Sequence, residues 1–376
     1  MKKLYLIALT LILILLIAAF PKFDGITGMV SLGTSGCGKK DTGLGRAYIG
    51  GSQGLIANFR SGEPPDKILD EVLEPFTIAF EVENKGEFTV DTGEATIVLS
   101  GINVQDFGLE PVGYGAGGGS ISSNVNPILG RVKIGNDIME PASGEILFDS
   151  PGGYNVDLEQ DFSTKIRADL CYFYNTEAVA NLCLKFNPIQ RRPELDVCRI
   201  DASKSVENSG SPVHFENFRE SRSGTREVRF SVDIINVGGG DVFSSEEYID
   251  DTPCIEDLES GSMERGLVKD WIYVGVVPQT TSYNIRCSSL ERPTPSRINI
   301  PQRGFENAID SGYVKLINGK TRIDCVVGTE AAQDTAFEIP VKLVAAYSYR
   351  TFIEKPITVE NAQIEDLEES GGLLYT

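Results

Sequence analysis

The chain has 376 residues, of which 41% are hydrophobic, which is enough for two domains that each bury a core. Its 34 basic and 54 acidic residues give a formal charge of −20, and such a surface repels nucleic acid and anionic lipid headgroups. Composition therefore argues against a phosphate-binding role and favours a well-solvated acidic surface.

The N-terminal region is typical of an export signal. Lys2-Lys3 precedes an apolar run over residues 4–20 that contains a single polar residue, Thr10. At about 1.5 Å per residue, a helix of this length just spans a bilayer. We expect a retained signal anchor that places the following residues outside the cell, so the membrane is the first expected partner. A cleaved signal peptide and lipidation at Cys37 are the alternatives.

Two stretches with one pattern organise the rest of the chain. Apolar side chains alternate with other residues over positions 76–82, and Asn84-Lys85-Gly86 ends the run with residues that turn easily. The pattern returns over positions 228–234, followed by Asn236-Val237-Gly238. This period is that of a strand with one buried face and one exposed face. Each stretch therefore predicts the main strand of an antiparallel sheet.

The strands around these stretches predict two domains. The first closes with an alternating run at 166–174 and a return strand at 182–186, and the second ends with a longer alternation over 337–349. Asn318-Gly319 predicts a hairpin turn in the second domain. No stretch sustains a helical apolar stripe, so we expect an all-β fold of two tandem antiparallel β-sandwiches after an N-terminal apolar helix. The predicted parts are the anchor or signal peptide (1–21), a flexible Gly- and Ser-rich stalk (22–53), the first sandwich (54–188), a linker (189–193), the second sandwich (194–360) and an acidic tail (361–376).

The two repeated units resemble the Ig-like, CARDB-type modules of archaeal and bacterial cell-surface proteins. Three features carry the resemblance: Ile78-x-Phe80-x-Val82-x-Asn84-x-Gly86, Phe230-x-Val232-x-Ile234-x-Asn236-x-Gly238, and the tyrosine strands that close each unit. The resemblance spans most of residues 55–360. It implies an Ig-like fold and a spacer or adhesive role, and it brings no active site with it.

Six of the seven cysteines fall in the predicted domains, where export allows disulfides to persist. Cys171 and Cys183 share one face of the expected hairpin, where opposed Cα atoms lie about 4.5–5.5 Å apart, so we expect a bridge between them. The other four allow three pairings and are too widely spaced for a typical zinc site. Of these pairings we favour Cys287–Cys325 with Cys198–Cys254.

Catalytic groups are scarce. His214 is the sole histidine, and no Gly-x-Ser-x-Gly lies near it, so we expect no catalytic residues and no cofactor. A dense group of carboxylates includes Glu246, Glu247, Asp250 and Asp251. They are candidates for binding calcium, although their spacing does not match a calcium loop, and a solvated acidic loop is the alternative.

Together these features predict a membrane-anchored extracellular protein with a structural, adhesive or envelope-assembly role and no catalysis of its own. Its expected partners are the membrane, through residues 4–20, and other envelope proteins or further copies of itself, and not nucleic acid. An accessory subunit of an envelope complex, bound through an exposed sheet edge, is one alternative. A secreted hydrolase that uses carboxylates is the other.

Overall fold

The computed structural model describes residues 47–71, 74–109, 121–124, 126–135, 137–190, 196–244, 269–278, 283–292 and 303–362. Every regular element in these ranges is a β-strand, which confirms the all-β prediction for this part of the chain. The predicted N-terminal helix, the stalk up to residue 46 and most of the acidic tail lie outside it. All described strands belong to one compact unit within residues 45–376.

Two very long strands form the centre of the fold. β9 (Phe162–Leu184) and β18 (Phe337–Glu360) pair antiparallel, from Phe337 opposite Leu184 to Val359 opposite Phe162. The hairpin predicted within residues 166–186 is therefore wrong. Residues 175–181 contain neither glycine nor proline, and the strand continues through them where the prediction placed a turn.

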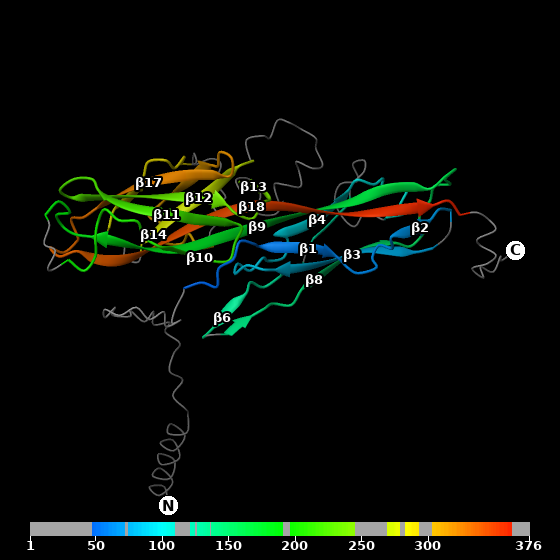
Figure 1. Ribbon diagram of the computed structural model, residues 1–376, viewed down its shortest axis with the longest axis horizontal. Helices are drawn as coiled ribbons and strands as arrows, with labels where there is room; N and C mark the ends of the chain where they lie inside the picture. Colours follow the sequence, from blue (N-terminus) through cyan, green and yellow to red (C-terminus); the bar gives the residue numbers. More distant parts are fainter. Residues whose placement is uncertain are drawn as a thin grey trace, which may run out of the picture. The chain divides into compact units, whose positions relative to one another are not determined.

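These two strands are the central members of a nine-stranded sheet (Figure 1). Beyond β9 it continues with β4 (Ala95–Ser100) and β5 (Ile121–Asn124), and beyond β18 with β14 (Trp271–Pro278) and β16 (Asp310–Lys315). Three short strands complete its edges: β10 (Val206–Asn208) on β9, and β2 (Lys67–Leu69) and β13 (Asp241–Phe243) on β18. The pairing of β2 with β18 is parallel, and every other strand pairing described is antiparallel.

Two smaller sheets carry the repeated stretches. β3 (Phe76–Asn84) lies between β1 (Leu55–Phe59) and β8 (Gly144–Ser150). β12 (Glu227–Asn236) lies between β11 (Val213–Arg222) and β17 (Lys320–Gly328), with β15 (Ile285–Cys287) beyond β17. The predicted alternation is confirmed, because the apolar residues of both stretches are buried, and they share one hydrophobic core with β4, β9, β14 and β18.

The two halves of the molecule have the same strand order. β1-β3-β8 corresponds to β11-β12-β17, and β5-β4-β9 corresponds to β16-β14-β18. The linker predicted at residues 189–193 lies between these halves in the sequence, but the halves share strands and one hydrophobic core. β9 continues from the first half to pair with β10, and β18 runs back from the second half to pair with β2. Two shared strands therefore join the halves.

The connections between corresponding strands differ. In the second half, residues 316–319 link β16 to β17, with Asn318 and Gly319 at φ values of 52° and 75°. These values suit the predicted turn, but β16 and β17 belong to different sheets, so the turn leads from one sheet to the other. In the first half, residues 125–143 make the corresponding link, and they include a separate hairpin of β6 (Val132–Ile134) and β7 (Asp137–Met139).

Candidate functional site

Each repeated Asn-x-Gly sequence forms a hydrogen-bonded centre with a tyrosine of a long strand. In the first half, Asn84 Nδ2 donates to Phe88 O (2.7 Å), and Asn84 Oδ1 accepts from the backbone N–H of Gly86 (3.0 Å) and from the Tyr174 hydroxyl (3.1 Å). A Cβ atom on Gly86 would overlap this hydroxyl, so the glycine is required by the close approach of the ring.

The second half repeats this centre with Asn236. Its Nδ2 donates to Gly240 O (2.7 Å), and its Oδ1 accepts from Gly238 N–H (3.3 Å) and the Tyr349 hydroxyl (2.9 Å). The same hydroxyl accepts from Gly240 N–H (2.7 Å). The Asn-x-Gly sequences and the tyrosine strands, noticed separately in the sequence, are two parts of one motif.

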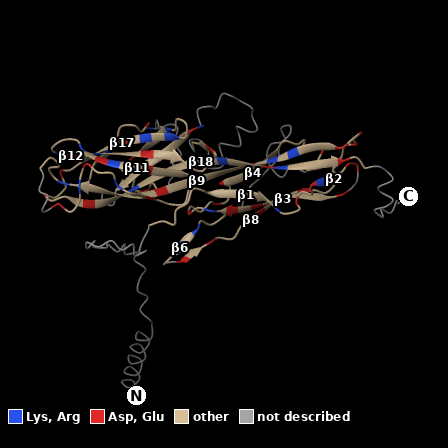
Figure 2. Cartoon of the chain, in the orientation of Figure 1, with Lys and Arg blue, Asp and Glu red and all other residues tan. Residues whose placement is uncertain are grey.

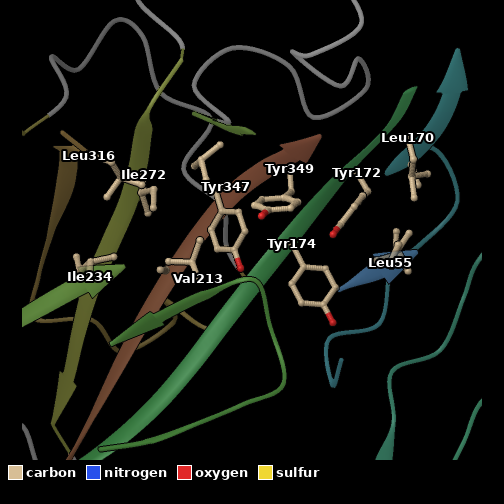
Figure 3. Close-up of a cluster of buried hydrophobic side chains, with 14 of the residues drawn as sticks. Leu55, Leu170, Tyr172, Tyr174, Val213, Ile234, Ile272, Leu316, Tyr347 and Tyr349 are labelled. Carbon is tan, nitrogen blue, oxygen red and sulfur yellow. The ribbon is translucent and has the colours of Figure 1, made fainter. Parts of the chain in front are cut away.

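Four tyrosines meet where β9 and β18 cross from one half to the other (Figure 3). Tyr174 lies opposite Tyr347, and Tyr172 lies opposite Tyr349, with the latter two rings 5.8 Å apart between centroids. Burial raises the pKa of Tyr172 and Tyr347 well above the usual range, and it raises that of Tyr349 to about 12. The four side chains are therefore neutral at physiological pH, and they act as packing and hydrogen-bonding groups.

Arg303 joins the loop before β16 to the first half. Its Nη1 lies 2.7 Å from Asp91 Oδ2, and its Nη2 lies 2.5 Å from both carboxylate oxygens of Glu94. The guanidinium carbon lies 4.3 Å from the centre of the Phe88 ring. These contacts, with the shared strands, hold the halves together.

The lone histidine has a structural contact. His214 Nε2 lies 3.0 Å from the carbonyl oxygen of Gly51, in the segment that leads into β1. The same segment is held by Glu87, whose carboxylate accepts from the backbone N–H groups of Ile49 and Gly50 at 3.0 Å each. His214 thus contributes to docking the chain that precedes β1.

Five carboxylates are buried in the described part of the chain. Each accepts a hydrogen bond from a backbone N–H group or lies near a basic side chain, which offsets part of the cost of burying a polar group. They are Asp70 (N–H of Leu158 and Ala362), Asp169 (Arg167), Glu220 (N–H of Cys183, and Lys204), Asp233 (Arg322 and Lys320) and Asp310 (N–H of Cys287, and Arg292). All five are thus explained by structural contacts.

The disulfides partly correct the predicted pairing. Cys287 is bonded to Cys325, as predicted, with a Cα–Cα distance of 4.0 Å. Cys183 is bonded to Cys198, so the predicted Cys171–Cys183 and Cys198–Cys254 bridges are wrong. Cys171 and Cys183 lie on one strand, about 40 Å apart at 3.3 Å per residue. Cys171 is also disulfide-bonded, and the two remaining cysteines, at positions 37 and 254, lie outside the described residues.

The calcium candidates Glu246, Glu247, Asp250 and Asp251 also lie outside the described residues. Within the described ranges, no group of three or more His, Cys, Asp or Glu side chains could hold a metal ion. Basic and acidic residues are interspersed along the strands shown in Figure 2. This pattern is that of a solvated surface.

The β6–β7 hairpin exposes an apolar face that sequence analysis missed. Val132, Ile134, Ile138 and Met139 are between 46% and 57% exposed, although such side chains are usually buried. Val132 lies opposite Met139, with Ile134 on the same face of β6. Arg131 fixes the base of the hairpin, since its guanidinium pairs with Glu140 (2.8 Å) and its backbone N–H donates to Gly86 O (2.8 Å). The apolar residues of β6 therefore face solvent.

A groove of about 280 Å³ opens between β1 and the β9–β18 pair in the first half. Its apolar lining includes Leu55 and Ala57 of β1, Ala168 and Leu170 of β9, and Ile353 of β18. The groove and the hairpin are two surfaces of the described chain that could receive a partner, and neither gave a distinct signal in the sequence.

The described part of the chain is therefore an all-β protein of antiparallel sheets that carries disulfides. Disulfides fit an extracellular domain. No protein-family model and no curated protein matches the sequence. Among solved structures, the chain aligns with the C-terminal domain of the AgI/II polypeptide BspA of Streptococcus agalactiae. The alignment has 10% identity and a TM-score of 0.13, and it covers 81% of this chain and 98% of that one. A TM-score of this size does not establish a common fold.

Within the described ranges, we find no helix with the length and apolar character needed to cross a membrane. The apolar run at residues 4–20, which predicts the membrane anchor, lies outside these ranges.

Proposed function

We propose that this chain is a membrane-anchored cell-surface protein with a structural, adhesive or envelope-assembly role and no catalysis of its own. Residues 4–20 supply the anchor, and the described strands form two Ig-like sandwiches of the CARDB type on the outer side of the membrane. Disulfides persist in that compartment, which supports this location.

The apolar face of the β6–β7 hairpin is the observation that carries the assembly role. An isolated two-stranded hairpin is at best marginally stable in water, and exposed apolar patches mark sites of interaction. The fold does not require this hairpin, because the second half makes the corresponding link with residues 316–319. A projecting element with three apolar side chains on one face therefore supports binding to another envelope component.

The hydrolase alternative receives less support. Retaining and inverting glycosidases need two carboxylates that face one another across the substrate. The buried carboxylates of the described chain are instead occupied by backbone N–H groups and by basic side chains. The accessory-subunit alternative is the same role with a defined partner, and the hairpin supports it equally.

A surface-assembly assay tests the proposal. The hairpin variant replaces Val132, Ile134 and Met139 with serine, and the control replaces Val197 and Ile317, which are 85% and 72% exposed. After mild detergent extraction of the envelope, we expect the wild-type and control chains to migrate in a complex larger than a single chain on native gels. The hairpin variant should migrate as a single chain.

The location is tested in the same cells. Protease added to intact cells should cleave the full chain, and deletion of residues 4–20 should release it from the membrane fraction. A chain that is protected in intact cells, or a hairpin variant that stays in the complex, would contradict the proposal.

A further inference from the structure

We infer that the open edge of β18 at residues 351–354, together with the groove beside β1, accepts an extended segment of a separate protein as an additional β-strand. The inference deepens the proposed role in envelope assembly by naming a second site and the form of its ligand. It rests on backbone geometry and on a comparison of the two halves of the chain.

The outer edge of β18 presents hydrogen-bonding groups that no described strand pairs with. Thr358 N–H donates to Asp66 O on this edge, and Glu360 O accepts there from Asp70 N–H. Because such groups alternate along a strand, the N–H and C=O of Phe352 and Glu354 point the same way. β13 pairs with residues 348–350 and β2 with residues 358–360, and no described strand pairs with the edge between them.

The facing edge of β1 has matching groups. Gly54 O accepts from Lys85 N–H, and Arg60 N–H donates to Ala79 O, so the even-numbered residues of β1 face β3. The N–H and C=O of Ala57 therefore point away from β3, toward the mouth of the groove. A strand placed there would pair with β18 on one side and lie beside β1 on the other, as β10 pairs with β9 and lies beside β11 in the second half.

The second half shows the corresponding place already filled. β10 pairs with β9, with Val206 opposite Ala180 and Asn208 opposite Ala178. On its other side, the Asn208 side chain donates to Phe215 O (2.9 Å) and accepts from Phe215 N–H (2.8 Å) on β11. Because β9 corresponds to β18 and β11 to β1, β10 occupies the equivalent of the open groove.

The described segment of this chain that corresponds to β10 does not enter the groove and makes contacts elsewhere. β10 precedes β11, so its counterpart is the stretch that precedes β1. There, Ala47 N–H donates to Glu207 Oε2 (2.7 Å), and Ile49 and Gly50 donate to Glu87. Residues 47–50 thus bind between Glu87 of the first half and Glu207 of the second, and no described segment of the chain enters the groove.

The geometry and charge define the occupant. It is an extended segment with an apolar side chain, as Val206 of β10 has, to enter the lining of Leu55, Leu170 and Ile353. Pro356 lacks an N–H group and limits the usable edge to the residues before it. A formal charge of −20 makes two copies repel one another, which favours a separate protein that is neutral or basic.

Site-specific photo-cross-linking on intact cells tests the inference. The probe is p-benzoylphenylalanine at position 352, where the native phenylalanine is 55% exposed. It is combined with Glu354→Pro, which removes an outward N–H group, or with the matched control Glu354→Ala, which keeps it. Thr351→Trp is a second variant, which fills the groove and leaves the edge groups in place. Thermal unfolding verifies that each variant folds.

We expect a cross-link to a segment of another protein, identified by mass spectrometry of the adduct. Its yield should fall roughly tenfold or more with Glu354→Pro and with Thr351→Trp, and it should stay unchanged with Glu354→Ala. No adduct, an adduct to residues 1–46 or to a second copy, or an adduct insensitive to both variants would overturn the inference. Protease access on intact cells does not involve the groove, so the proposed location can stand if this inference fails.

Discussion

The tyrosine of the second Asn-x-Gly centre offers a direct test of whether the two halves unfold together. Tyr349→Phe removes a hydroxyl that donates to Asn236 Oδ1 (2.9 Å) and accepts from Gly240 N–H (2.7 Å). A net value of about 0.5–1.5 kcal/mol for each hydrogen bond predicts a loss of about 1–3 kcal/mol in the free energy of unfolding. Tyr174→Phe should cost less, because its bonds to Asn84 and Phe88 are longer, at 3.1 and 3.4 Å.

The assay is equilibrium unfolding in guanidinium chloride, followed by circular dichroism and by tyrosine fluorescence. β9 and β18 belong to both halves, so we expect a single transition whose midpoint moves in either variant while its slope stays constant. The control is the double variant Asn236→Ala with Tyr349→Phe, whose effect should be smaller than the sum of the single effects. Two separate transitions, with only one of them moved by each variant, would refute the reasoning.

Three further predictions concern titration, disulfides and glycine. Burial raises the pKa of Glu220 from 4.5 to about 8. Between these two pH values the folded chain retains a proton that the unfolded chain loses, so the contribution of Glu220 to the free energy of unfolding falls as the pH rises from 4.5 to 8. Glu220→Gln should flatten this fall, and unfolding curves at pH 4 and pH 8.5 that change equally would contradict it. Replacing Cys183 and Cys198 with serine should cost about 2–4 kcal/mol in denaturant unfolding, and an unchanged midpoint would argue against the bridge. Gly238→Ala should lower the melting temperature, because the added Cβ would press on Tyr349 and Pro212. The control Gly152→Ala should leave it unchanged, because its Cβ would meet nothing closer than 3.7 Å. Equal shifts in the two variants would count against this packing.

The strands of this fold were predictable where one face is buried and the other exposed. Residues 76–82 and 228–234 show this period clearly, and both became strands of the expected burial. The pairing of distant strands was not predictable, because alternation fixes which side chains point inward but not which strand lies alongside. The same limit explains the Cys171–Cys183 error, since two cysteines on one continuous strand show the same alternation as two on a hairpin.

The candidate surfaces were harder to predict than the strands. Val132 and Ile134 have the composition of a buried strand, and only the three-dimensional structure shows that nothing in the described chain covers them. The groove beside β1 depends on where residues 47–50 bind, which is decided by contacts with Glu87 and Glu207 far along the chain. The Asn-x-Gly repeat, by contrast, did predict where β3 and β12 end, although not the contact of each asparagine with a tyrosine.

The shared strands also set the order in which this chain can fold. β4 can pair early with one edge of β9, because it precedes β9 in the chain. The other edge of β9 has no partner until β18, the last strand of the described chain, has been made. Until residues 337–360 have left the ribosome, a 23-residue strand carries one unpaired ladder of N–H and C=O groups, which is a template for aggregation. Synthesis that stops before β18 would leave both halves unfinished, so this architecture can be completed only after residues 337–360 have been made.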